Sequence, residues 1–207
     1  MSVKNLEELN PIQIDVLREI GNIGSGNAAT SLSGMLSNSI DIGVPTVKTL
    51  EYEEVVDFLG GPENVVIGLL IRLSGDIKGM MMYIIQKSFA NVVLNTFYGK
   101  QLDDILNVDE MDKSAISEIG NIMAGSYVNA IAGLTGLTID ISPPSFCVDM
   151  AGAILSVPAI EFAQVGDRVI FIDDNFKISD DEIKSNMILI PEMESLSLLF
   201  SKLGVEI

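Results

Sequence analysis

The sequence predicts an α/β (α+β) fold, a single pseudo-two-fold symmetric domain built from two internal αβ repeats. Three observations predict it: the chain has 207 residues, the length of one ordinary domain; the sequence repeats itself; and each copy alternates helical and strand patterns. A shift of 99 residues aligns positions 15–45 with positions 114–144 without a gap, and 11 of these 31 positions are identical. Self-similarity at a fixed spacing indicates one structural unit used twice. We expect one domain over residues 1–207, with repeat one at about 10–100 and repeat two at about 109–205.

Each copy begins with a long helix and a strand-rich stretch. Asn10 followed by Pro11 is typical of a helix start, and the apolar pattern predicts a helix to about Leu36. The stretches Ile40–Leu50 and Ile139–Ser142 then favour strands, each with a proline at the same place in its copy.

The remainder of repeat one predicts a hairpin between two helices. A short helix is expected at Glu53–Leu59, and strands at Val65–Leu73 and Gly79–Gln86. Ser88 is expected to cap a helix that runs to Tyr98 and ends at the glycine that follows.

The remainder of repeat two predicts the same order. Val148–Ala163 is expected to be mostly helical, interrupted by one proline. Strands follow at Val169–Asp173 and Met187–Pro191, and a helix at Glu192–Leu203. The acidic stretch Asp174–Lys184 is expected to be a solvated loop.

Composition excludes several classes of function. With 12 Lys and Arg against 29 Asp and Glu, the net charge is −17, so no basic surface is expected for a nucleic acid or an anionic membrane. The chain has no histidine, which excludes catalytic triads and zinc sites that need imidazole. The single cysteine, Cys147, has no disulfide partner and is expected to be a small core or surface thiol. No apolar stretch is long enough to span a membrane, and we expect a cytoplasmic monomer.

A polar stripe on the first helix of each copy is the candidate site, although polar residues are also expected on the outer face of an amphipathic helix and duplication alone would copy them. At 100° per residue, spacings of four and three place two acidic or hydroxyl positions and an amide on one helical face. The residues are Asp15, Glu19 and Asn22 in the first copy and Ser114, Glu118 and Asn121 in the second, followed by Pro45 and Pro144. Gly26 and Gly125 extend the two stripes, and a bare patch there lets another macromolecule approach closely, whereas Gly21 and Gly24 are expected to pack in the core.

This set of side chains favours positioning chemistry over proton abstraction. A carboxamide can hold a water molecule by one donor and one acceptor, and a carboxylate can pair with a cation of a partner. Hydrolysis of a reactive phosphoryl group needs alignment above all, because its transition state is loose.

The sequence resembles the CheC-type phosphatases of bacterial chemotaxis, the CheC/CheX/FliY family, which share a D/S-x3-E-x2-N-x22-P signature. Both copies match every element of that signature at unaltered spacing, and each contains Glu-Ile-Gly-Asn-Ile, at 19–23 and 118–122. The resemblance covers essentially the whole chain.

The resemblance implies dephosphorylation of the aspartyl phosphate of the response regulator CheY. It assigns the positioning of the in-line water to Asn22 and Asn121, and pairing with a regulator lysine to Glu19 and Glu118. The remaining signature residues, Asp15, Ser114, Pro45 and Pro144, would support the two sites. The magnesium ion would belong to the regulator, and this chain would carry no cofactor of its own. Family members also bind the deamidase CheD.

One alternative interpretation stays open on the residues alone, and a second is disfavoured by geometry. A duplicated scaffold could bind a regulator or deamidase without hydrolysing anything. A carboxylate-pair glycosidase would need a cleft, which a convex helical stripe does not offer. For the deamidase, we expect docking on the apolar segment Phe146–Leu155, with Asp149 as a contact, because repeat two departs most from repeat one there.

Overall fold

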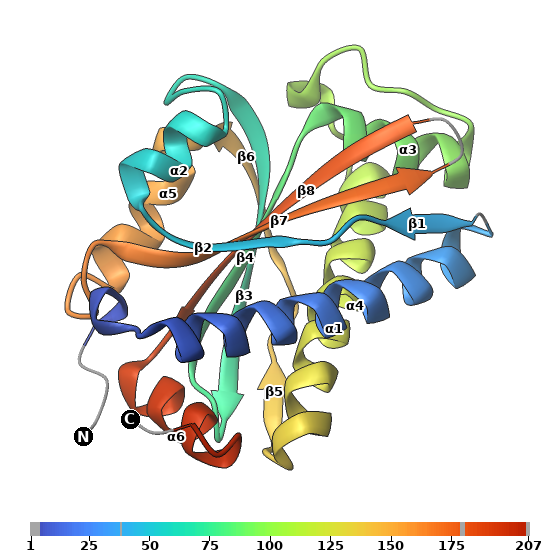
Figure 1. Cartoon of the computed structure of the whole chain (residues 1–207). Helices are drawn as coiled ribbons and strands as arrows, with labels where there is room; N and C mark the ends of the chain where they lie inside the picture. Colours follow the sequence, from blue (N-terminus) through green and yellow to red (C-terminus); the bar gives the residue numbers. More distant parts are fainter. Residues whose placement is uncertain (1–4, 38, 179–180, 206–207) are drawn as a thin grey trace.

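Two equivalent sets of helices and strands build one eight-stranded sheet with helices on both faces (Figure 1). The computed structural model describes residues 5–37, 39–178 and 181–205. Repeat one contains the 3-10 turn η1 (Leu6–Glu8), α1 (Pro11–Leu36), β1 (Ile40–Ile42), β2 (Thr46–Glu51), α2 (Tyr52–Phe58), β3 (Val65–Gly75), β4 (Gly79–Ile85) and α3 (Lys87–Tyr98). Repeat two contains η2 (Ile105–Asn107), α4 (Glu110–Thr135), β5 (Ile139–Ile141), β6 (Ser145–Met150), α5 (Ala151–Glu161), β7 (Arg168–Ile178), β8 (Asp181–Pro191) and α6 (Met193–Lys202). The predicted fold class is confirmed.

The two repeats exchange their edge strands. β1 and β2 of repeat one pair antiparallel with β7, whereas β5 and β6 of repeat two pair antiparallel with β3. The β3–β4 and β7–β8 hairpins meet in the middle of the sheet, where β4 pairs with β8. Each repeat therefore completes the sheet of the other, and neither can satisfy its own edge or bury its own core alone.

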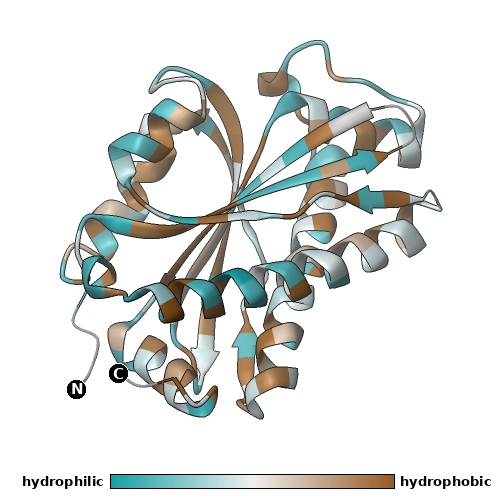
Figure 2. Cartoon of the chain, in the orientation of Figure 1, coloured by the Kyte–Doolittle hydropathy of each residue, from teal (hydrophilic) through white to brown (hydrophobic). Residues whose placement is uncertain are grey.

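The helices form two unequal layers. The main core lies between the sheet and α1, α3, α4 and α6, and a smaller core lies under α2 and α5 on the opposite face. The central part of the sheet is largely brown in Figure 2, while outer turns of the helices carry teal. α1 and α4 contact each other on the main face, and both also contact strands, so only their outward sides are free to carry a site.

The acidic stretch Asp174–Lys184 is not a loop, and that prediction is wrong. It continues β7 and β8 into a long hairpin. Phe176 and Ile178 are buried and alternate with exposed Asn175 and Lys177, which is the period of a strand with one covered face. Residues 179 and 180 of this stretch lie outside the described residues.

Two smaller predictions are also corrected. Val148–Ala163 is mostly helical, as predicted, but pairing with β3 keeps its first three residues, up to Met150, extended. α5 then passes through Pro158 without ending there. Ser88 does not cap α3; it is the second residue of that helix, whose N-cap is Gln86.

Candidate active site

The helices that carry the two stripes both begin with reciprocal caps. In α1, the Asn10 side chain accepts a hydrogen bond from the Gln13 backbone N–H at 3.0 Å, and Gln13 Oε1 accepts from the Asn10 N–H at 2.9 Å. Pro11 occupies the first helical position. In α4, Asp109 and Asp112 form the same arrangement. Such capping boxes fix the first turn, from which the stripe follows at constant spacing.

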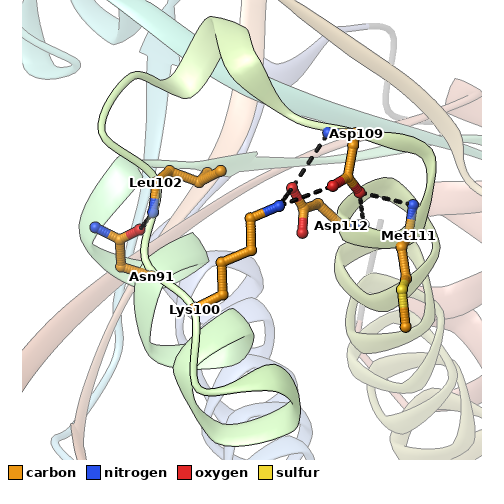
Figure 3. A network of polar contacts seen from close by, with 6 residues as sticks. All are labelled: Asn91, Lys100, Leu102, Asp109, Met111 and Asp112. Atoms are coloured by element: carbon orange, nitrogen blue, oxygen red, sulfur yellow. Dashed lines mark hydrogen bonds and ion pairs between the residues drawn. The ribbon is translucent and has the colours of Figure 1, made fainter.

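The start of α4 is held further by a lysine from the loop after α3 (Figure 3). Lys100 Nζ lies 2.8 Å from Asp109 Oδ2 and 2.6 Å from Asp112 Oδ2. Asp112 is 1% exposed, and a buried carboxylate needs such a partner. The hydrogen bond from Lys100, more than any other cause, holds the pKa of Asp109 below its usual value. The α3–α4 loop therefore positions the second stripe.

The polar signature residues lie on the outward faces of α1 and α4, as the helical geometry predicts, and the signature prolines lie in the loops after β1 and β5. We call Asp15, Glu19, Asn22 and Pro45 site one, and Ser114, Glu118, Asn121 and Pro144 site two. The acidic and hydroxyl members are exposed, as is Asn22, while Asn121 is half-buried. Within the described part of the chain, the Glu and Asn side chains of both sites make no hydrogen bond or ion pair. Their polar groups are thus available to a ligand.

Site two is hollowed. A cavity of about 340 Å³ is lined by Ser114, Ser117, Glu118, Asn121, Ile141, Pro143 and Pro144. All four signature residues of repeat two, separated by up to 30 positions, meet in this one cavity. The loop after β5 supplies the prolines, and α4 supplies the polar groups. The carboxamide of Asn121 therefore stands in a recess rather than on a flat helix surface.

Site one has a different neighbour on the same stripe. Asp15 Oδ1 accepts a hydrogen bond from Arg18 Nη1 at 2.7 Å, where repeat two has Ser114 and Ser117. Both side chains of this ion pair are largely exposed, so it contributes little to stability. The ion pair holds the Asp15 carboxylate beside Glu19, however, and places two charged side chains next to site one where site two has two serines.

The glycines of the stripe helix divide as predicted. A Cβ at Gly21 would lie 2.7 Å from Val47 Cγ2, and one at Gly24 would overlap the ring of Tyr127. These two glycines allow close packing of α1. At Gly26 and Gly125, a Cβ would meet nothing within 4 Å. Packing therefore does not require glycine at these two positions, which form the bare outer patch next to each Glu–Asn pair.

A buried polar cluster that the sequence did not predict lies behind site one. Ser25, one turn beyond Asn22, hydrogen-bonds to both Asp174 Oδ1 and Tyr127 Oη, and Tyr127 Oη donates to Asp174 Oδ2 at 2.8 Å. Desolvation is the main cause that raises the pKa of Asp174 to about 6. Tyr83 Oη, also buried, has no partner within the described residues. One sequence feature could have indicated this cluster: Ser25 is a serine on the apolar face of α1, where repeat two has Ala124.

The other candidate residues lie elsewhere. Asp149 is exposed on β6, where its Oδ1 accepts from the Met150 N–H at 2.8 Å. The Phe146–Leu155 segment is not peculiar to repeat two, because β6 and α5 match β2 and α2; that premise is wrong. Desolvation raises the pKa of the Cys147 thiol, so it stays protonated near neutral pH and is a poor nucleophile.

Two further cavities contain none of the signature residues. One of about 480 Å³ lies beside the Arg72–Glu161 ion pair, and one of about 430 Å³ lies between α2 and α5. Across residues 5–37, 39–178 and 181–205, no group of three or more His, Cys, Asp or Glu side chains could hold a metal ion. No helix within those ranges is long and apolar enough to cross a membrane.

Comparison with known proteins matches both stripes. The model of the CheC-like family matches residues 12–49 and 111–148, the segments that contain the two signatures. The "CheY-P phosphatase CheC" of Bacillus subtilis (strain 168) is 38% identical over 199 residues, which cover 94% of this chain and 95% of that protein.

Solved structures share the fold. The crystal structure of Thermotoga maritima FliY has a TM-score of 0.73 at 24% identity, covering 95% of this chain and 98% of that one. The Borrelia burgdorferi structure described as the CheX-CheY-BeF3-Mg+2 complex has a TM-score of 0.52 at 22% identity, covering 82% of this chain and 96% of that one. Given the match to Bacillus subtilis CheC along nearly its whole length, this chain belongs to the CheC-like family.

Proposed function

We propose that this protein is a phosphatase that hydrolyses the aspartyl phosphate of the chemotaxis response regulator CheY, at both site one and site two. The observation that carries the proposal is the recess at site two, where Glu118 and Asn121 stand together with no partner among the described residues. A 38% identical relative named CheY-P phosphatase supports the substrate.

The asparagines hold the attacking water. Asn22 and Asn121 each present one acceptor and one donor, so a carboxamide can bind a water molecule and aim it in line with the phosphoryl bond that breaks. This contribution is alignment, which suits a loose phosphoryl-transfer transition state. No general base is needed, which fits a chain with no histidine.

The glutamates orient the partner. Glu19 and Glu118 lie three residues before the asparagines, one helical turn away on the same face. An ion pair between this carboxylate and a lysine of the regulator fixes the regulator so that its phosphoryl group meets the asparagine. The magnesium ion stays on the regulator. Gly26 and Gly125 leave room for the backbone of the regulator. Asp15 and Pro45 border site one, and Ser114 and Pro144 border site two.

The proposal extends to a second partner and a compartment. The exposed carboxylate of Asp149, on the edge strand β6, is a contact for the deamidase CheD. Reversing this charge weakens deamidase binding in a pull-down and leaves unassisted hydrolysis intact; undiminished binding removes Asp149 from that surface. The protein acts as a cytoplasmic monomer, consistent with one unpaired cysteine.

The deciding experiment is the decay of ³²P-labelled CheY-P with and without this protein. Accelerated decay that requires the asparagines supports catalysis. A lifetime that is unchanged at stoichiometric excess, together with retained binding, supports the alternative of a non-catalytic module. Asn27→Ala is a matched control, because Asn27 is an exposed asparagine of α1 outside the signature.

A further inference from the structure

Each stripe continues, beyond its polar residues, to an exposed apolar side chain. Ile12 is 65% exposed and Met111 is 61% exposed, and they occupy the same position, 99 residues apart, in the two repeats. Isolated exposed apolar residues are common on proteins. Here the residue type differs between the copies, yet both the apolar character and the exposure are the same.

The helix places these residues within reach of the same partner. At 100° and 1.5 Å per residue, Ile12 lies within about 20° of Glu19 around α1 and about 15 Å along the axis from Asn22. A typical interface of about 800 Å² per partner is roughly 30 Å across. A protein that covers both Glu19 and Asn22 therefore reaches Ile12, which lies about 10 Å along the axis from Glu19 on the same face, and the same holds for Met111 beside Glu118 and Asn121.

Both apolar residues are held by the caps. Each is the second residue of its helix, inside a capping box, and the Met111 N–H donates to Asp109 Oδ1 at 2.9 Å. Figure 3 shows the Met111 side chain pointing away from the network around Lys100. Because the backbone under these side chains is fixed, little backbone entropy is lost when they are covered.

The loop that carries the signature proline adds a second apolar residue. Val44, directly before Pro45, is 87% exposed. Its counterpart Pro143 is exposed and lines the cavity of site two. Each Glu–Asn pair is thus accompanied by one apolar residue on the helix and one on the loop.

We propose that these residues form an apolar rim, Ile12 with Val44 at site one and Met111 with Pro143 at site two, that binds an apolar patch of the regulator beside its phosphorylated aspartate. The proposal rests on the proposed function and names the contacts that retain the regulator. The ion pair made by the glutamate orients the partner, while burial of the rim slows its release.

The rim is tested first by binding, without relying on hydrolysis. In the Asn22→Ala/Asn121→Ala background, Ile12→Ser and Met111→Ser are added together, and the dissociation constant for CheY, phosphorylated with acetyl phosphate and Mg²⁺, is measured by calorimetry. We expect a rise of about tenfold, which corresponds to 1.4 kcal/mol. Ile160→Ser is the matched control: Ile160 is 77% exposed, but on α5, across the sheet from both sites. Thermal melts verify that each variant folds.

Kinetics then separate retention from chemistry. In the Asn121→Ala background, where only site one works, Ile12→Ser should raise KM about tenfold and leave kcat unchanged, as expected for an interaction made equally in ground and transition states. Val44→Ser should act in the same direction. An unchanged dissociation constant, or an equal rise in the Ile160→Ser control, overturns the rim. If the wild-type protein hydrolyses nothing, the proposed function fails, and the binding measurement still decides the rim.

Discussion

Site one and site two contain the same Glu–Asn pair, but the residues around the pair differ between the two sites. Site two is a recess of about 340 Å³ whose helix is anchored from outside by Lys100. Site one has the exposed Asp15–Arg18 pair on its flank and is anchored from inside, where Ser25 meets Tyr127 and Asp174. The two sites share the pair and its spacing, while different contacts support each of them, those of site one coming from Tyr127 and Asp174 of repeat two.

The largest effect is expected when both sites lose the amide. The proposed function assigns the in-line water to these two amides, so in Asn22→Ala/Asn121→Ala hydrolysis should fall to the spontaneous decay of the regulator. The measurement is the decay of labelled CheY-P at saturating protein. Substantial acceleration by the folded double variant would show that another group positions the water.

The single variants test whether the sites act separately. Each site has its own Glu, Asn, glycine and proline, so the rates should add, and the residual values of kcat/KM in Asn22→Ala and Asn121→Ala should sum to roughly that of the wild type. We expect Asn22→Ala to keep the larger share, because Asn121 stands in a formed recess. Near-complete loss in both folded variants contradicts independence, since that is the behaviour of residues that act as one unit.

The inner anchor of site one predicts a pH effect on stability. The folded pKa of Asp174 is raised to about 6, above the usual value of about 3.9, so its protonated form favours the folded state. Its contribution is present below about pH 4 and is lost as pH rises through 6. Asp174→Asn removes this titration, so the free energy of unfolding of the variant, relative to that of the wild type, should rise by about 2 kcal/mol between pH 4 and pH 7.

Urea denaturation at several pH values measures that gain. The comparison is made between the variant and the wild type at each pH, because the other carboxylates then cancel. A difference that does not change with pH would mean that Asp174 titrates normally. Tyr127 and Tyr83, whose pKa values are raised well above their usual value by burial, stay neutral over this range.

The outer glycines test close approach of the partner, with a smaller effect on stability. Gly26→Ala adds a Cβ into open space on a helix, so the free energy of unfolding should rise by about 1 kcal/mol while the activity of site one falls. Gly24→Ala is the contrasting variant, because its Cβ would overlap Tyr127 and should destabilise the fold. Full activity of the Gly26→Ala protein in the Asn121→Ala background would remove Gly26 from the interface.

What the sequence could and could not predict follows from the range of the interactions. The faces of α1 and α4, with Glu19 and Asn22 outward and Gly21 inward, follow from local helical geometry. The exchange of edge strands and the burial of Asp174 depend on contacts between distant segments, such as Ser25 with Asp174, which no local pattern encodes. The β7–β8 hairpin was likewise missed, because its acidic residues resemble a loop and its strand pairing also depends on contacts between distant segments.

The smallest effect expected is on the stability of the single asparagine variants. Asn22 and Asn121 make no hydrogen bond within the described chain, and alanine is the better helix former, so the free energy of unfolding should hold or rise by a few tenths of a kcal/mol. The gain should be the clearer at exposed Asn22, since Asn121 also loses contacts in its recess. Thermal melts beside the activity assay check both values. A loss of ~1–3 kcal/mol in each variant is expected when a structural hydrogen bond is broken, and it would show that the asparagines stabilise the fold.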